Sequence, residues 1–198
     1  MEFVPLEIRW HGRGGYGAKT AALLLAEAVI DFGGFAQASP EFGPERRGAP
    51  VQAYTRISPQ PVRRRGPVEK PDLLVLLDPR LAKSPGVLEG VGPRTHLVVN
   101  GPGPVEVPGA APDRVLYLDA SGIARRTVGR EVPNVPLLAA VAVGFVGLPP
   151  GPFLRWLEGR LRRELAEDVV RRNVEAARLA LEEVQPWLRT GRLSTVGR

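Results

Sequence analysis

The sequence predicts a three-layer α/β/α fold in which helices cover a mostly parallel or mixed β-sheet. Segments typical of strands alternate along the chain with segments whose apolar residues recur at helical spacing. Three strand segments, 73–78, 97–100 and 115–119, are nearly uninterrupted apolar runs, as in strands buried on both faces. No repeat or long linker divides the 198 residues, so we expect one domain over 1–198 with a helical C-terminal region from about 153.

The N-terminal part predicts three strands and one helix. Apolar residues at helical spacing indicate a helix over 16–32, and the pair Gly33-Gly34 supplies its C-terminal stop. Residues 51–57 alternate between apolar and polar side chains, which is typical of an edge or antiparallel strand with one wet face. The strands expected in this part are 6–10, 35–39 and 51–57.

The C-terminal part predicts helices. One begins near Asp119 or Ser121, another spans about 135–146, and a long amphipathic run covers 153–187. The longest apolar stretch, 137–148, is interrupted by glycine and is too short to cross a membrane. We therefore expect no membrane partner.

Composition excludes several classes of site. The chain has no cysteine, so it cannot by itself hold an iron–sulfur cluster, a disulfide or a thiolate nucleophile. His11 and His96 are the only histidines, and neither has the spaced companions of a metal site. We predict no metal and no catalytic residue in this chain. The N-terminus lacks the features of a signal peptide, which predicts a cytoplasmic protein.

The net charge of +6 raises the question of nucleic-acid binding. The one basic triplet, 63–65, lies in a loop flanked by proline and glycine, without interleaved aromatic residues or a helix-turn-helix pattern. A solvated loop or a subunit contact accounts for it better, so we expect no nucleic-acid partner.

A glycine-rich segment, 12–17, joins the first strand to the first helix. Glycine permits positive φ and close approach of the backbone to a ligand, and a helix start presents free N–H groups to anions. The segment matches G-x-G-x-x-G, but the acid that would bind a ribose about 20 residues later is absent. It also approximates a P-loop, with Lys19 displaced by one residue and 73–78 imitating the strand whose acid holds magnesium. The third interpretation is a tight turn that only serves packing.

A second segment concentrates charge in a rigid frame. Glu45, Arg46 and Arg47 are consecutive and lie between Gly43-Pro44 and Gly48-Ala49-Pro50. Proline and glycine on both sides restrict the backbone, which suits recognition of an anionic group or of a partner surface. A solvated turn is the alternative.

These two segments resemble the gamma subunit of 2-oxoacid:ferredoxin oxidoreductases, the pyruvate and ketoisovalerate group. Residues 12–21, GRGGYGAKTA, resemble the opening G-R-G-G-Q-G-hydrophobic-x-T-A of that family, with Tyr16 where glutamine is usual. Residues 42–51, FGPERRGAPV, resemble its F-G-x-E-R-R-G-A-P-V. The likeness extends over most of the chain, through 55–58, 71–79, 98–100, 119–124, 132–134 and 172–176.

The resemblance implies a fold like domain III of pyruvate:ferredoxin oxidoreductase and a subunit that is inactive alone. The assembly would decarboxylate a 2-oxoacid such as pyruvate, form an acyl-coenzyme A and reduce ferredoxin, with thiamine diphosphate, magnesium and iron–sulfur clusters on other subunits. Partners would be the alpha, beta and cluster-bearing subunits, with ferredoxin reached through the complex. An independent nucleotide-binding protein, P-loop-like or dinucleotide-binding, is the alternative.

The resemblance also nominates site residues for subunit docking and for placing coenzyme A. Backbone amides of the glycine segment would meet phosphate, Arg46 or Arg47 would bind an anion, and Glu45 would serve a ligand or an interface clamp. The candidate cofactor-binding residues are Gly12, Arg13, Gly14, Gly15, Gly17, Thr20, Arg46 and Arg47, and the candidate interface or ligand residues are Glu45 and Asn134.

Overall fold

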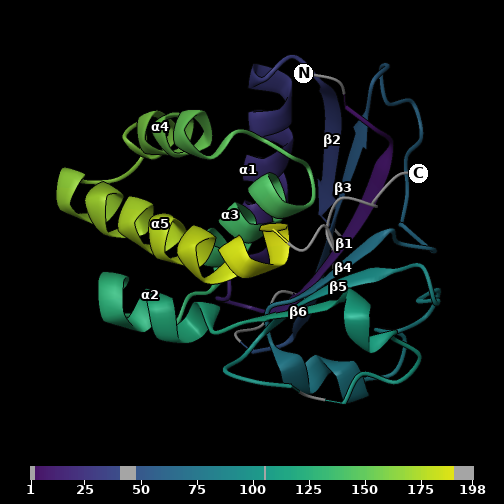
Figure 1. The fold of residues 1–198 in the computed structure, drawn as a ribbon. Coiled ribbons are helices and arrows are strands. Elements are labelled where there is room, and N and C mark those ends of the chain that lie inside the picture. The colour runs from purple at the N-terminus through teal and green to yellow at the C-terminus, as the bar shows by residue number, and fades with distance from the viewer. Residues whose placement is uncertain (1–2, 41–47, 105, 190–198) are drawn as a thin grey trace.

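A six-stranded mixed sheet organises the chain in a computed structural model that describes residues 3–40, 48–104 and 106–189. The strand order is β2-β3-β1-β4-β5-β6 (Figure 1). β1, β4, β5 and β6 are mutually parallel, and β3 runs antiparallel to both β1 and β2. The strands are β1 (Leu6–Arg13), β2 (Phe35–Pro40), β3 (Pro50–Ser58), β4 (Leu73–Leu76), β5 (His96–Asn100) and β6 (Val115–Leu118).

The predicted α/β fold with a mixed sheet is confirmed, and β3 refines it. Its alternating sequence suggested an edge or antiparallel strand; it is antiparallel but internal, between β2 and β1. The alternation arises because the two faces of this part of the sheet differ. Ala53, Thr55 and Ile57 register with the β1 residues that face the helices, whereas Tyr54 and Arg56 lie on the opposite face.

All five α-helices of the described residues contribute to a single hydrophobic cluster on one face of the sheet. In Figure 1 they lie together on one side of the strands. Over β4, β5 and β6, the opposite face is covered by loops and by the 3₁₀ helix η1 (Pro79–Lys83), so the second outer layer is not α-helical. The helices are α1 (Ala18–Asp31), α2 (Ala120–Val128), α3 (Asn134–Gly144), α4 (Pro150–Leu161) and α5 (Glu167–Arg189).

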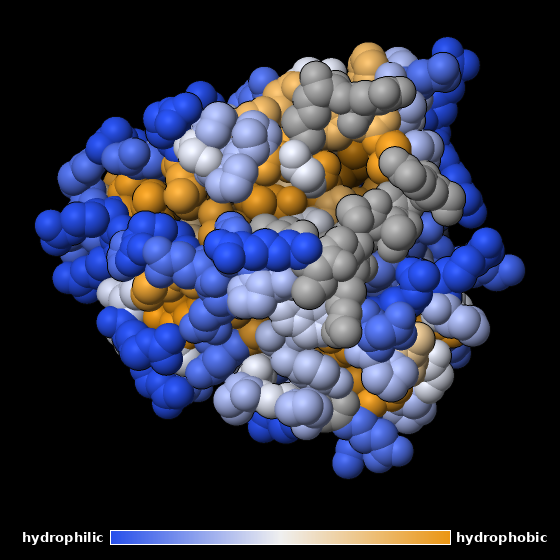
Figure 2. Space-filling model, viewed as in Figure 1, coloured by the Kyte–Doolittle hydropathy of each residue, from blue (hydrophilic) through white to orange (hydrophobic). Residues whose placement is uncertain are grey.

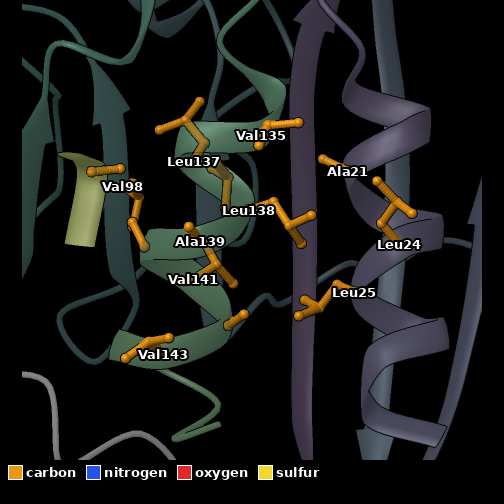
Figure 3. Close-up of a cluster of buried hydrophobic side chains, with 14 of the residues drawn as sticks. Ala21, Leu24, Leu25, Val98, Val135, Leu137, Leu138, Ala139, Val141 and Val143 are labelled. Carbon is orange, nitrogen blue, oxygen red and sulfur yellow. The ribbon is translucent and has the colours of Figure 1, made fainter. Parts of the chain in front are cut away.

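Helix α3 is the centre of the core. Its residues from Val135 to Val143 are all buried, so the long apolar stretch is a helix enclosed by protein. Figure 3 shows Leu137 directed toward Val98 of β5 and Leu138 toward β1 and α1. Within the described residues, no helix is both long and apolar enough to span a bilayer.

The helical run predicted over 153–187 is two helices. A turn at 162–166 separates α4 from α5, and Arg162 crosses it by bonding Glu158 on one side and Glu167 on the other. No glycine or proline marks this turn, which is why the sequence did not reveal it. The break lets both apolar faces reach the same core, and Figure 2 shows hydrophobic side chains along the line where α4 meets α5.

Two buried arginines fasten loops to the sheet face opposite the helices. Arg56 donates to the carbonyls of Gly66 and Pro67 at 2.8 Å each. Arg9 donates to the carbonyl of Val68 at 3.2 Å and, through its second nitrogen, to loop carbonyls beyond β4. Backbone carbonyls thus accept from the terminal nitrogens of both guanidinium groups, and Nε of Arg56 pairs with the Glu7 carboxylate at 2.7 Å.

Candidate functional site

The glycine loop, residues 13–17, connects β1 to α1 at the carboxyl end of the parallel strands. Gly15 and Gly17 have φ values of 95° and 77°, and the N–H of Tyr16 donates to the carbonyl of Arg13 at 2.9 Å. Only glycine adopts such positive φ without strain, so the loop conformation depends on these two residues. The chain leaves β1 toward β2 at one edge of the sheet and leaves β4 toward β5 on the other side. Open α/β sheets bind ligands at such points, where the connections of two adjacent parallel strands run in opposite directions.

The first turn of α1 leaves its amides available. Gly17 caps the helix without a side-chain hydrogen bond, and the first turn contains no acidic residue. The leading N–H groups of a helix have no partner within it and carry partial positive charge. This end of α1 can therefore receive an anion.

Asn134, which the sequence nominated as an interface or ligand residue, lies against the glycine loop. A Cβ atom on Gly17 would stand 2.5 Å from Nδ2 of Asn134, well inside van der Waals contact. Gly12 has another role: a Cβ there would lie 3.2 Å from Cβ of Ala18, so its glycine lets β1 approach α1 closely. Gly12 is not among the residues that line the adjoining pocket.

A pocket of about 930 Å³ opens between the glycine loop and the segment that precedes α3. Of the candidate residues, Arg13, Gly14, Gly15, Gly17, Thr20 and Asn134 line it. Glu45, Arg46 and Arg47 lie outside the described residues. The pocket also includes residues that the sequence did not nominate as a site: Tyr16, Ala18, Lys19, Val51, Arg130, Glu131 and Val132.

The pocket wall is predominantly basic. Lys19 and Arg130 approach it from opposite sides, and the Glu131 carboxylate is paired with Arg125 at 3.0 Å. Arg130 has no ion-pair partner among residues 3–40, 48–104 and 106–189. The sequence indicates a turn at 129–133, just before Asn134, and this turn contains Arg130. Nothing local in the sequence, however, places Arg130 opposite the glycine loop.

Asp78 lies beside the glycine loop, two residues beyond β4. Its carboxylate is only 2% exposed and accepts from Nε of Arg13 at 2.5 Å and from Nε of Arg80 at 2.9 Å. It also accepts from the backbone N–H of Arg80 at 3.0 Å, which caps η1. Burial acts to raise the pKa of this carboxyl, but the hydrogen bonds from Arg80 and Arg13 outweigh it and hold the pKa below its ordinary value.

This pairing bears on the P-loop interpretation. A magnesium-binding acid needs free carboxylate oxygens, whereas both oxygens of Asp78 already accept from guanidinium groups. In the part of the chain that the structure describes, no three His, Asp or Glu side chains group as a metal site. The geometry gives the P-loop-like alternative no support.

The glycine loop is hydrogen-bonded to the two residues that precede β3. The N–H of Gly14 donates to the carbonyl of Ala49 at 2.9 Å, and the N–H of Gly48 donates to the carbonyl of Gly14 at 3.3 Å. Nη1 of Arg13 adds a bond to the carbonyl of Gly48 at 3.0 Å. Gly48 directly follows Arg47 in the sequence, so the two segments that the sequence singled out adjoin at this point.

Comparison with known proteins decides the family. The family model described as pyruvate ferredoxin/flavodoxin oxidoreductase matches residues 7–183. The chain belongs to this family. It is 42% identical to pyruvate synthase subunit PorC of Methanothermobacter thermautotrophicus, over 91% of this chain and 96% of that protein. It is 38% identical to the pyruvate/ketoisovalerate oxidoreductases common subunit gamma of Pyrococcus abyssi, over 91% of this chain and 97% of that one. The resemblance to the gamma subunit is thus confirmed.

Solved structures of the family share the fold. Pyruvate oxidoreductase subunit PORC of Thermotoga maritima superposes with a TM-score of 0.73 at 35% identity, covering 90% of this chain and 96% of that one. The gamma subunit of a keto/oxoacid ferredoxin oxidoreductase from Geobacter sulfurreducens gives 0.72 at 25% identity, with 92% and 97% covered. The chain is accordingly a gamma-type subunit of this oxidoreductase family.

Proposed function

We propose that this gamma-type subunit docks against the other subunits of a 2-oxoacid:ferredoxin oxidoreductase and that its pocket holds the phosphate-bearing part of coenzyme A. The observation that carries the proposal is the basic pocket itself. It combines the N-terminus of α1, which has no side-chain cap, with Lys19 and Arg130. Coenzyme A is the anionic reactant of acyl-coenzyme A formation. Backbone amides and cationic side chains are the groups that recognise phosphate.

The chemistry of the chain supports a division of labour within the complex. Its sequence has no cysteine, so iron–sulfur clusters must be ligated by other subunits. Thiamine diphosphate and magnesium would also lie on the partners, where decarboxylation takes place. This chain would bind and orient coenzyme A at the edge of that site, with Arg46 and Arg47 as further candidates for contact and Glu45 as a clamp.

The outer face of α1 supports a docking role. Leu23 and Ile30 are 46% and 52% exposed and lie seven positions apart, which places them on one side of the helix. Phe35, at the start of β2 beyond the end of α1, is 43% exposed. Large apolar side chains that share a face favour a protein interface over a solvated surface. α1 would thus meet a partner subunit on this face and anions at its N-terminus.

The test is kinetic and uses the complex purified through a tag on this chain under anaerobic conditions. Oxoacid- and coenzyme A-dependent dye reduction gives KM and kcat for coenzyme A. Arg130→Ala should raise the KM by about tenfold, the worth of one charge-assisted contact, and leave kcat unchanged. The matched control is Arg155→Ala, which removes an exposed arginine of α4 that does not line the pocket.

Equal KM values for the Arg130→Ala, Lys19→Ala and control complexes would contradict a coenzyme A site in this pocket. A tagged chain that purifies alone and binds ATP or NAD would instead favour the independent nucleotide-binding alternative.

A further inference from the structure

We infer that Asp78 is a positioning residue that fixes the start of the glycine loop through Arg13. This inference rests on the proposed function of the loop, and it assigns Arg13 a different part from the ligand contact that the sequence suggested. Arg13 holds the loop in place, and the ligand is left to the backbone amides and to the cations on the pocket wall.

The start of the loop is held directly. Arg13 is the last residue of β1, and its Nε lies 2.5 Å from Oδ2 of Asp78, while its Nη1 reaches the carbonyl of Gly48. Two nitrogens of the Arg13 guanidinium thus donate to protein atoms, and the Arg13 side chain is 29% exposed. A single side chain thereby joins the loop, the end of β4 and the residue after Arg47.

Asp78 is itself held in place by Arg80. The Arg80 guanidinium donates to both oxygens of Asp78, at 2.9 and 3.3 Å from Nε, and at 3.0 Å from Nη2. Asp78 is the main cause that raises the pKa of Arg80. The carboxylate that receives Arg13 is therefore fixed at the end of β4 by a second guanidinium.

Backbone hydrogen bonds at Gly14 and Tyr16 also hold the loop, but Gly15 between them is open. Gly15 has φ of 95° and no other atom within 4 Å of where its Cβ would be, so no side chain packs there. A glycine-rich segment has many accessible backbone conformations, and ordering it costs conformational entropy. Arg13 also accepts from the N–H of Tyr16 through its carbonyl, so fixing Arg13 helps to order the loop amides before a ligand arrives, which preserves binding free energy for the ligand.

The experiment compares Asp78→Asn with Asp119→Asn in the whole complex. Both acids cap helices. Asp78 caps η1, and Asp119 caps α2, where Oδ1 of Asp119 accepts from the N–H of Gly122 at 2.9 Å. Only Asp78 adjoins the glycine loop. Two readouts are taken: amide hydrogen exchange of residues 13–20 without coenzyme A, and the KM and kcat for coenzyme A.

Asp78→Asn should raise exchange in the glycine loop and raise the KM for coenzyme A about tenfold, with kcat nearly unchanged, because the loop is displaced and the reacting groups are not. Asp119→Asn should change neither. A merely structural role for Asp78 would lower complex yield without this split between KM and kcat.

The two readouts separate the two hypotheses. Unchanged exchange in Asp78→Asn overturns the positioning role, whatever the kinetics. Raised exchange with an unchanged KM supports the positioning role and counts against coenzyme A as the ligand of the loop.

Discussion

Gly17→Ala is the substitution whose cost follows most directly from the structure. An alanine at φ of 77° pays about 1–2 kcal/mol for the left-handed conformation. Its Cβ would also stand 2.5 Å from Nδ2 and 2.7 Å from Cγ of Asn134, so that side chain must leave its place, at about another 1 kcal/mol. Gly33→Ala is the matched control, because φ there is 87° and a Cβ would meet nothing within 4 Å.

The free energy of unfolding of Gly17→Ala should therefore fall by about 2–3 kcal/mol, against about 1–2 kcal/mol for the control. Calorimetry of the subunit should show a melting temperature lowered by about 5–10 °C for the first and by about half as much for the second. In the complex, only Gly17→Ala should raise the KM for coenzyme A. Equal losses of stability and equal KM values for the two variants would refute the reasoning, because they would mean that Asn134 does not pack on the loop.

Two further predictions concern acid stability and docking. Burial lowers the pKa of His11 to about 3 and that of His96 to about 4, aided by the charges of Arg9 and Arg114 respectively, so both rings stay neutral in the fold. The unfolded chain takes up these protons below its ordinary histidine pKa of about 6.5, so stability is full above that pH and declines below it, by about 2 kcal/mol per histidine at pH 5. Urea midpoints at pH 8 and pH 5 measure the decline, which His11→Gln should reduce and which an unaltered difference in that variant would contradict. Separately, Leu23→Glu with Ile30→Glu should release this chain from its partner subunits during tag purification without lowering its own melting temperature, and a fully retained complex would show that this face of α1 does not dock.

The sequence predicted the elements that local rules govern. Period-2 and period-3.6 patterns located the strands and helices, and glycine marked the turn between β1 and α1 because no other residue adopts its backbone angles without strain. The turn between α4 and α5 was missed because no such residue marks it. Likewise, the apolar stretch at α3 was recognised as too short to cross a membrane, but its central place in the core was not predicted.

The sequence by itself thus determined the turns that glycine marks, the strands that are buried apolar runs and the family that the chain resembles. The tertiary structure decided which residues meet. Asp78 and Arg13 are 65 positions apart and pair because β4 lies beside β1 in parallel register, and Arg130 reaches the pocket because α3 packs against α1. Local conformation follows from neighbouring residues, whereas a site formed by distant segments depends on strand order and packing, which no short window of sequence encodes.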